Sequence, residues 1–289
     1  MLLAIDVGNT NIVIGVFEGE LLAASWRLTT HPVRTADEYA ALMRTLLEQR
    51  GLEINRVAGV SLASTVPPLT STFRELAARY FRVTPLIVSS QIRTGVRIAV
   101  DSPEEVGADR IVDALAAWRL YETPAVVVDF GTATTFDAIS AAGELLGTAI
   151  APGFLTSMEG LYAHAAKLQR IEFQSPGTAI GRNTVAAMRS GWIYGYVGLV
   201  EGLVTRIKAE LGGNPLVIAT GGLADLVVRE TRIVDVTDGN LTLQGLRLIY
   251  DLNHEPVLAT PEGVVRSNQD SRSAGGPAEA AQVSTKAPR

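Results

Sequence analysis

Two short segments of the chain place an aspartate, a glycine and several side-chain donors directly after an apolar run. They are residues 6–11 (DVGNTN) and 129–135 (DFGTATT). A glycine lets the backbone approach a ligand closely, and successive N–H groups in such a turn can bind an anion. Each segment alone is equally well explained as an ordinary hairpin turn, because Asp, Gly and Asn are common turn residues. The occurrence of both segments in one chain favours phosphate binding.

The polar side chains of these segments suit a nucleotide. Asp6 can hold Mg²⁺ against phosphates, directly or through water. The hydroxyl and amide groups add hydrogen-bond donors, from Asn9, Thr10 and Asn11 in the first segment and from Thr132, Thr134 and Thr135 in the second. We expect the two segments to clamp the same phosphates from opposite lobes.

A third segment, residues 107–110 (GADR), lies near the predicted start of a helix. The helix dipole favours an ionised carboxylate there by about 0.3–1 kcal/mol. An ionised Asp109 can orient a substrate hydroxyl and accept its proton during phosphoryl transfer, and Arg110 can bind a carboxylate through a forked hydrogen bond. A solvated Asp–Arg pair in a first helical turn is the simpler interpretation of this segment on its own.

The apolar periodicity around these segments predicts strands and helices in alternation. In the first half we predict strands at 2–5, 12–17, 21–28, 57–62 and 84–88, and helices at 36–49, at 69–80 and from Ser102-Pro103 through Trp118. In the second half we predict strands at 125–128, 136–139, 145–150 and 216–219, a helical region at 183–211, and a helix opened by Thr220-Gly221-Gly222. Thr35 and Glu38 have the spacing of a capping box.

The opening pattern of acidic turn, glycine and second turn recurs after Pro124, so we predict a duplicated unit. The expected fold is α/β, with two lobes each built from a βββαβαβα unit. We place a first lobe at 1–120, a second lobe at 121–256 and a disordered tail at 257–289, where apolar periodicity is lost.

Composition excludes several classes of protein. The formal net charge is −5 and the pI is about 5.4, which makes nucleic acid an unsuitable partner. The 289 residues include no cysteine, which excludes disulfides and thiolate sites. We expect a cytoplasmic protein without membrane association, because the chain shows no signal peptide and no apolar run of about 20 residues. The defining glycine motifs of P-loop kinases and dinucleotide dehydrogenases are also absent.

Four motifs together resemble type III pantothenate kinase. They are residues 6–11 (DVGNTN), 107–110 (GADR), 129–134 (DFGTAT) and 181–184 (GRNT), and the resemblance covers about residues 1–253. It implies the actin-like ATPase fold with two ribonuclease-H-like lobes, a homodimer, and transfer of the γ-phosphate of ATP to the 4′-hydroxyl of pantothenate at the start of coenzyme A synthesis.

The resemblance also implies roles for single residues. Asp109 would be the proton acceptor, and Asp129 would ligate a monovalent cation, K⁺ or NH₄⁺. The ATP-binding residues would be Asp6, Val7, Gly8, Asn9, Thr10, Asn11, Ile12, Val13 and Thr132, with Mg²⁺ at Asp6. The pantothenate-binding residues would be Gly107, Ala108, Asp109, Arg110, His164 and Thr184, the last from the partner-facing side.

Two departures from the family pattern concern the substrate pocket. Val100 stands where many relatives have a tyrosine, and Ala165 stands where relatives often have a threonine. Two alternatives remain: another small-molecule kinase on the same fold, such as a sugar kinase, which the duplicated acidic turns alone would allow, and a nucleotide-binding regulatory protein.

Overall fold

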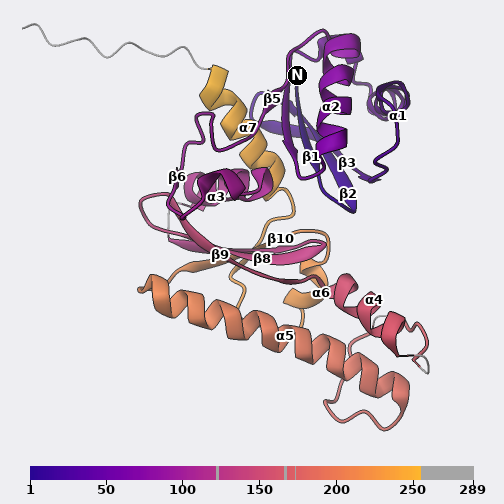
Figure 1. Cartoon of the computed structure of the whole chain (residues 1–289), viewed down its shortest axis with the longest axis vertical. Coiled ribbons are helices and arrows are strands. Elements are labelled where there is room, and N and C mark those ends of the chain that lie inside the picture. Colours follow the sequence, from indigo (N-terminus) through magenta and orange to yellow (C-terminus); the bar gives the residue numbers. More distant parts are fainter. Residues whose placement is uncertain (122–123, 166–167, 173, 255–289) are drawn as a thin grey trace, which may run out of the picture. The chain divides into compact units, whose positions relative to one another are not determined.

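The computed structural model describes residues 1–121, 124–165, 168–172 and 174–254. The tail predicted at 257–289 lies outside the described residues. Figure 1 shows two β-sheets with helices between them and on their outer faces.

The first sheet has five strands in the order β3-β2-β1-β4-β5. The strands are β1 (Leu2–Val7), β2 (Asn11–Glu18), β3 (Leu21–Thr29), β4 (Gly59–Ser64) and β5 (Leu86–Ile87). Strands β1 to β3 form an antiparallel meander, while β4 runs parallel to β1 and β5 runs parallel to β4. The central strands are apolar runs because both faces of the sheet are covered.

The second sheet repeats this arrangement. Its strands are β6 (Arg97–Ile98), β7 (Ala125–Phe130), β8 (Ala133–Ile139), β9 (Glu144–Pro152), β10 (Leu216–Thr220) and β11 (Val236–Thr237). Their order is β11-β10-β7-β8-β9-β6. Apart from β6, each strand matches one of the first sheet in order and direction, which confirms the predicted duplicated fold.

The helices connect the strands in equivalent places of the two units. They are α1 (Ala36–Glu48), α2 (Pro67–Leu76), α3 (Ala108–Tyr121), α4 (Phe154–His164), α5 (Thr184–Leu211), α6 (Ala224–Val228) and α7 (Leu241–His254), with 3₁₀ turns at Ile54–Arg56 and Pro103–Glu105 and a π-helical turn at Ala77–Phe81. Thr35 and Glu38 form the predicted capping box of α1, and Asn183 caps α5 by accepting from Ala186 N at 2.9 Å.

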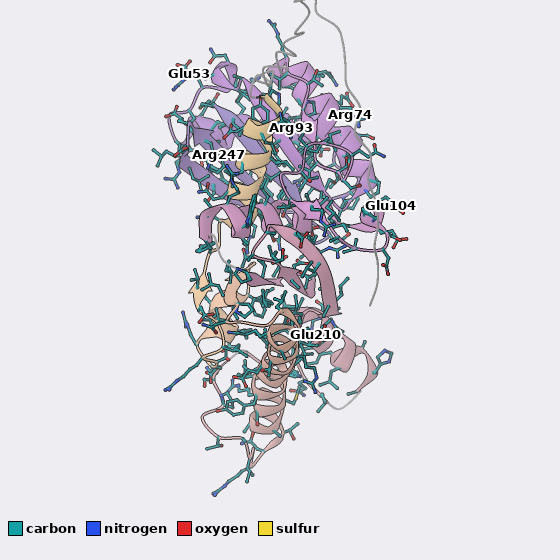
Figure 2. All side chains as sticks on the ribbon, turned by 90° about the vertical axis from the view of Figure 1, so that its left-hand side faces the viewer. Glu53, Arg74, Arg93, Glu104, Glu210 and Arg247 are labelled. Carbon is teal, nitrogen blue, oxygen red and sulfur yellow. The ribbon has the colours of Figure 1, made fainter. Side chains whose placement is uncertain are left out.

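The predicted helix from Ser102-Pro103 to Trp118 begins later than expected. Pro103–Glu105 is a single 3₁₀ turn, and Val106 after it is extended, with φ −71° and ψ 124°. The α-helix starts at Ala108. Glu104 in the 3₁₀ turn points away from the ribbon (Figure 2), while Asp109 is half-buried. The break places Asp109 in the first turn of α3.

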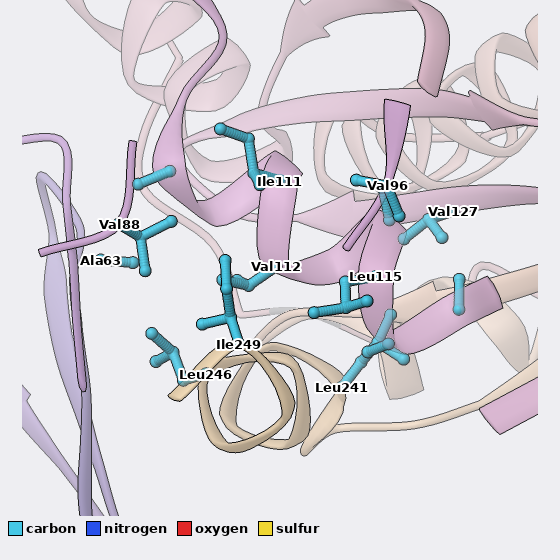
Figure 3. Close-up of a cluster of buried hydrophobic side chains, with 14 of the residues drawn as sticks. Ala63, Val88, Val96, Ile111, Val112, Leu115, Val127, Leu241, Leu246 and Ile249 are labelled. Carbon is cyan, nitrogen blue, oxygen red and sulfur yellow. The ribbon is translucent and has the colours of Figure 1, made fainter. Parts of the chain in front are cut away.

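Helices α3 and α7 lie between the two sheets, and their apolar side chains form one central core (Figure 3). The two helices approach closely at Gly245, where an added Cβ would lie 2.1 Å from the carbonyl oxygen of Val112. Helix α7 packs against β1 and β4 of the first sheet, whereas α3 packs against β7 and β8 of the second as well as β4. Each unit therefore contributes a helix to the layer that joins the sheets.

Two further cores lie on the outer sides of the sheets. One packs α1 and α2 against the first sheet around Tyr39 and Phe73, and the other packs α4 and α5 against the second sheet around Phe130 and Tyr196. Residues Met1 to Glu255 form one unit by their contacts, and β6 from the first half joins the second sheet. The division into lobes at 1–120 and 121–256 stays a prediction. No helix in the described part of the chain has the length and apolar character needed to cross a bilayer.

Candidate active site

The two acidic turns predicted from the sequence are β-hairpin turns that touch each other. Gly8 N donates to Asn11 O at 2.9 Å in the β1–β2 turn, and Gly131 N donates to Ala133 O at 3.1 Å in the β7–β8 turn. The hydroxyls of Thr10 and Thr132 lie 2.7 Å apart and share a hydrogen bond. Both threonines are exposed. Two turns whose threonines are 122 positions apart in the chain therefore touch each other.

Strand register places Asp6 on the face of the first sheet that is turned toward the second sheet. Asp6 pairs with Val13, and Val13 pairs with Arg27. Directly opposed residues of antiparallel strands share a face, and Val13 belongs to the central core between the sheets. The row from Asp6 to Arg27 therefore faces the second sheet.

The second sheet carries the equivalent row. Asp129 pairs with Thr135, and Thr135 pairs with Ile150. Val127, two positions before Asp129 on the same strand, lies in the central core, so Asp129 points toward the first sheet because side chains alternate along a strand. The two aspartates thus face each other across the layer that contains α3.

Three aspartates share one electrostatic environment. Burial raises the pKa of Asp6 well above its ordinary value, and the charges of Asp109 and Asp129 raise it further. Burial, then Asp109, raises the pKa of Asp129 to about 7, against an opposing effect of Arg27. Because Coulomb interactions weaken with distance, these effects indicate that the carboxylates on β1, α3 and β7 lie close together.

The backbone at the start of α3 positions Asp109. Its Oδ1 accepts from Arg110 N at 2.9 Å. An added Cβ on Gly107 would lie 2.4 Å from the same oxygen. Glycine at 107 is therefore required for the observed place of the carboxylate, a constraint that spacing alone does not reveal.

Arg110 connects this helix start to the second sheet. Its guanidinium donates to Thr148 Oγ1 at 3.3 Å and to Glu105 O at 3.4 Å. Thr148 in turn donates to Asp137. This chain of contacts holds Arg110 against β8 and β9, beside Asp109.

Asp113 and Asp137 are buried carboxyl groups that the sequence analysis missed. Asp137 is fully buried, and its pKa rises to about 7 by burial, with Thr148 and Arg110 opposing the rise. Burial and then Asp129 raise the pKa of Asp113 well above its ordinary value. Asp113 Oδ1 has no hydrogen-bond partner among the described residues. Two features of the sequence could have indicated them. Asp113 follows Asp109 by four positions, and Asp137 is an acidic residue inside an apolar strand.

One expectation for the second turn differs from the structure. Thr134 was expected as a phosphate donor, but its side chain is buried and hydrogen-bonded to the hydroxyl of Tyr196. Alternation along β8 turns Thr134 to the α5 side of the sheet, while Thr135 donates to Asp137 at 3.4 Å. Of the three threonines, Thr132 alone is exposed at the turn.

The remaining predicted substrate residues lie elsewhere. His164 ends α4 with Ala165 as its C-cap, and both His164 and Thr184 are exposed. An open pocket of about 590 Å³ lies at the start of α5, and its lining includes Leu161, Arg182, Thr184 and Trp192. The structure gives neither His164 nor Thr184 a contact with the aspartates of the hairpin turns.

The aspartates at the turns suit a cation that brings further ligands. Among the described residues, no three His, Cys, Asp or Glu side chains converge closely enough to hold a metal ion by themselves. Mg²⁺ in nucleotide sites commonly takes one or two carboxylates and completes its shell with phosphates and water. Like-charged, half-buried carboxylates such as Asp6 and Asp129 are also groups whose ionised forms a bound cation stabilises.

Comparisons with known proteins agree on one family. A family model described as type III pantothenate kinase matches residues 2–206. The type III pantothenate kinase of Myxococcus xanthus is 52% identical over 254 residues, which are 88% of this chain and 99% of that protein. That of Moorella thermoacetica is 51% identical over 253 residues, 88% of this chain and 100% of that protein.

Solved structures share the fold at low sequence identity. A conserved protein from Campylobacter jejuni, assigned to the Baf family of transcriptional activators, aligns with a TM-score of 0.54 and 19% identity over 87% of this chain and 98% of its own. The ethanolamine utilization protein EutJ from Carboxydothermus hydrogenoformans gives 0.53 and 16% over 86% and 89%. These two likenesses concern the fold alone. The family match over most of the chain, with more than half of the residues identical to full-length relatives, makes this chain a member of the type III pantothenate kinase family.

Proposed function

We propose that the chain transfers the γ-phosphate of ATP to the 4′-hydroxyl of pantothenate, the first step of coenzyme A synthesis, in the cytoplasm. The observation that carries this proposal is the meeting of the two hairpin turns, with Thr10 and Thr132 at 2.7 Å, beside the carboxylate of Asp109. Phosphoryl transfer depends on alignment and charge neutralisation more than on covalent chemistry, and this site supplies groups for both.

The nucleotide side of the site would be the two turns. Backbone N–H groups of residues 6–13 and the hydroxyl of Thr132 would bind the ATP phosphates, as such turns bind anions. Asp6 would hold Mg²⁺, and Asp129 would ligate K⁺ or NH₄⁺. Bound cations would neutralise phosphate charge locally, which fits a chain with a formal net charge of −5.

The acceptor side would be the start of α3. Asp109, in the first helical turn, would orient the 4′-hydroxyl and accept its proton. Gly107, Ala108 and Arg110 would border pantothenate. Arg110 is already held by Thr148 and Glu105, so its guanidinium is oriented before substrate binds, which reduces the entropy lost on binding.

The proposed homodimer would pair the α5 face. Gly191, Gly195 and Gly198 are exposed on α5, and a Cβ added to any of them meets nothing within 4 Å. Small residues on one helix face permit close approach of a second helix. Val185 on α5 and Leu161, which lines a pocket together with Gly191, are exposed large hydrophobic residues. In such a dimer Thr184 and His164 would serve the pantothenate site from the partner-facing side.

A coupled assay tests the proposal. Purified protein with ATP, Mg²⁺ and K⁺ should phosphorylate pantothenate, and replacing K⁺ by Na⁺ should lower the rate. A panel of sugars and other alcohols serves as the comparison. Absence of turnover with pantothenate by folded protein, or clear preference for a sugar, would overturn the proposal.

A further inference from the structure

Arg27 on β3 is a cation at the site that the reaction scheme above does not use. It is exposed, and no hydrogen bond or ion pair involving it is found within the described ranges. Its charge nevertheless acts on Asp129 in the second sheet, whose pKa it lowers. The half-buried carboxylate of Asp129 in the second unit therefore lies within electrostatic reach of a guanidinium from the first.

A second observation fixes where the guanidinium lies. An added Cβ on Gly222 would be 2.4 Å from Arg27 Nη1 and 3.5 Å from Nη2. Gly222 follows β10, and its neighbour Gly221 has φ +90° and lies against Asp129 and Phe130. The side chain of Arg27 therefore crosses from the first sheet and rests on the glycine turn beside the second acidic hairpin.

The position of Arg27 matters because the site has few other positive charges to bind an anion. The two turns present backbone N–H groups and threonine hydroxyls, which are neutral donors, and the lysine of a P-loop is absent from the sequence. Arg110 is engaged by Thr148 and Glu105 on the acceptor side. Arg27 has a free fork of donors, and a guanidinium fork matches phosphate oxygens geometrically.

We propose that Arg27 is a nucleotide-binding residue, whose guanidinium, seated on Gly222, donates to the phosphates of ATP from the first unit. The ligand class is a nucleoside polyphosphate rather than the nucleoside alone. The inference rests on the ATP site of the proposed function but does not depend on which alcohol accepts the phosphate.

Direct binding measurements test it. Arg27→Ala should weaken Mg·ATP binding by roughly 10- to 100-fold, the range for a lost charge-assisted hydrogen bond, and Arg27→Lys should recover part of the loss. Arg44→Ala removes an exposed arginine from α1 and should bind ATP like wild type. Adenosine, measured by competition, should bind Arg27→Ala and wild type equally, because it carries no phosphate.

Gly222→Ala supplies a second variant that keeps the arginine. Its methyl group would displace the guanidinium without removing the charge, and ATP binding should weaken in the same direction by a smaller factor. Circular dichroism and thermal melting establish that each variant is folded.

The outcomes separate this inference from the kinase assignment. Equal ATP affinity in Arg27→Ala and Arg44→Ala would overturn the inference, and so would an equal loss for ATP and adenosine, which indicates a structural role. If wild type fails to phosphorylate pantothenate but Arg27→Ala still loses ATP affinity selectively, the inference stands and the proposed acceptor is wrong.

Discussion

The two units share a fold, but they carry different residues at equivalent positions on the sheet faces that are turned toward each other. Asp6 and Asp129 occupy the same place in register, and the third strand then carries Arg27 in the first unit and Ile150 in the second. Ile150 is 65% exposed. The first unit thus has a cation where the second has an apolar side chain.

At a second pair of equivalent positions, the charged side chain is in the second unit and the first unit has a glycine. Gly15 pairs with Ala4 two residues before Asp6, and Asp137 pairs with Val127 two residues before Asp129. A Cβ on Gly15 would lie 2.9 Å from Leu243 Cδ1 of α7, whereas Asp137 meets Thr148. In the first unit, Leu243 of α7 packs directly on Gly15, whereas the second unit has a buried carboxyl group at the equivalent position. Duplication therefore supplied the scaffold, and single residues made the two halves chemically different.

The largest expected effect lies outside the duplicated turns. Asp109→Asn should lower kcat by about 10²–10⁴, the span for loss of a general base, and leave ATP affinity nearly unchanged. Steady-state kinetics with pantothenate and a separate ATP titration measure the two effects. A variant within a few-fold of wild type would remove Asp109 from the chemistry.

The buried Asp137, which has no counterpart in the first unit, predicts a pH effect on stability. Its folded pKa of about 7 lies above its ordinary value of 3.8, so the native state holds a proton that the unfolded chain has lost. The resulting stabilisation is full below about pH 4 and is lost as the pH rises to 7. In Asp137→Asn the free energy of unfolding should therefore decrease less steeply with rising pH, by up to about 1.4 kcal/mol per pH unit.

Urea unfolding at several pH values between 4 and 8 measures this slope. Asp225→Asn, at an exposed position on α6, is the matched control. A slope in Asp137→Asn identical to that of the control would contradict the buried-proton interpretation.

The close backing of the second turn predicts a packing effect. An added Cβ on Gly153 would lie 2.3 Å from Thr132 O and 2.5 Å from Gly131 O. Gly153→Ala should cost about 1–3 kcal/mol, as overpacking does, and should displace Thr132. Gly147→Ala, on the preceding strand β9, places its methyl group where nothing lies within 4 Å. Thermal melting should show a lower Tm for Gly153→Ala than for Gly147→Ala.

The smallest expected effect concerns the hydrogen bond between Thr10 and Thr132 of the two turns. Thr10→Val removes a hydroxyl partner of Thr132. It should lower the free energy of unfolding by at most about 0.5–1.5 kcal/mol, the net range for a hydrogen bond, because both side chains are exposed. A double-mutant cycle with Thr132→Val isolates the interaction. A coupling energy of zero would mean that the turns touch without stabilising each other.

Much of the fold was predictable from the sequence because its signals are local. The apolar runs, the capping box at Thr35 and the recurrence of an acidic glycine turn each depend on neighbouring residues. The predicted first, second and third strands of both units agree with the structure to within a few residues. The helix predicted from Pro103 was wrong at its start because a 3₁₀ turn carries the same initial signal.

The candidate site was predictable only where a motif carried it. Residues 6–11, 107–110 and 129–132 stood out by type and spacing. The duplicated pattern predicted that the two turns share one phosphate site, whereas the role of 107–110 beside them came from the family resemblance. Thr134 was assigned to the wrong face because alternation along β8 was not applied to the turn. Arg27 and Asp137 belong to no motif. Their roles could not be predicted because they depend on contacts with residues that are distant in the sequence.

The sequence by itself therefore determined the strands, the duplicated topology and the acidic turns, because period, propensity and turn chemistry act over a few residues. Only the tertiary structure decided that Arg27 rests on Gly222, that Asp137 is buried and bonded to Thr148, and that the charges of Asp109 and Asp129 raise the pKa of Asp6. The physical reason is that Coulomb energies and burial depend on distance through space, which chain separation does not report.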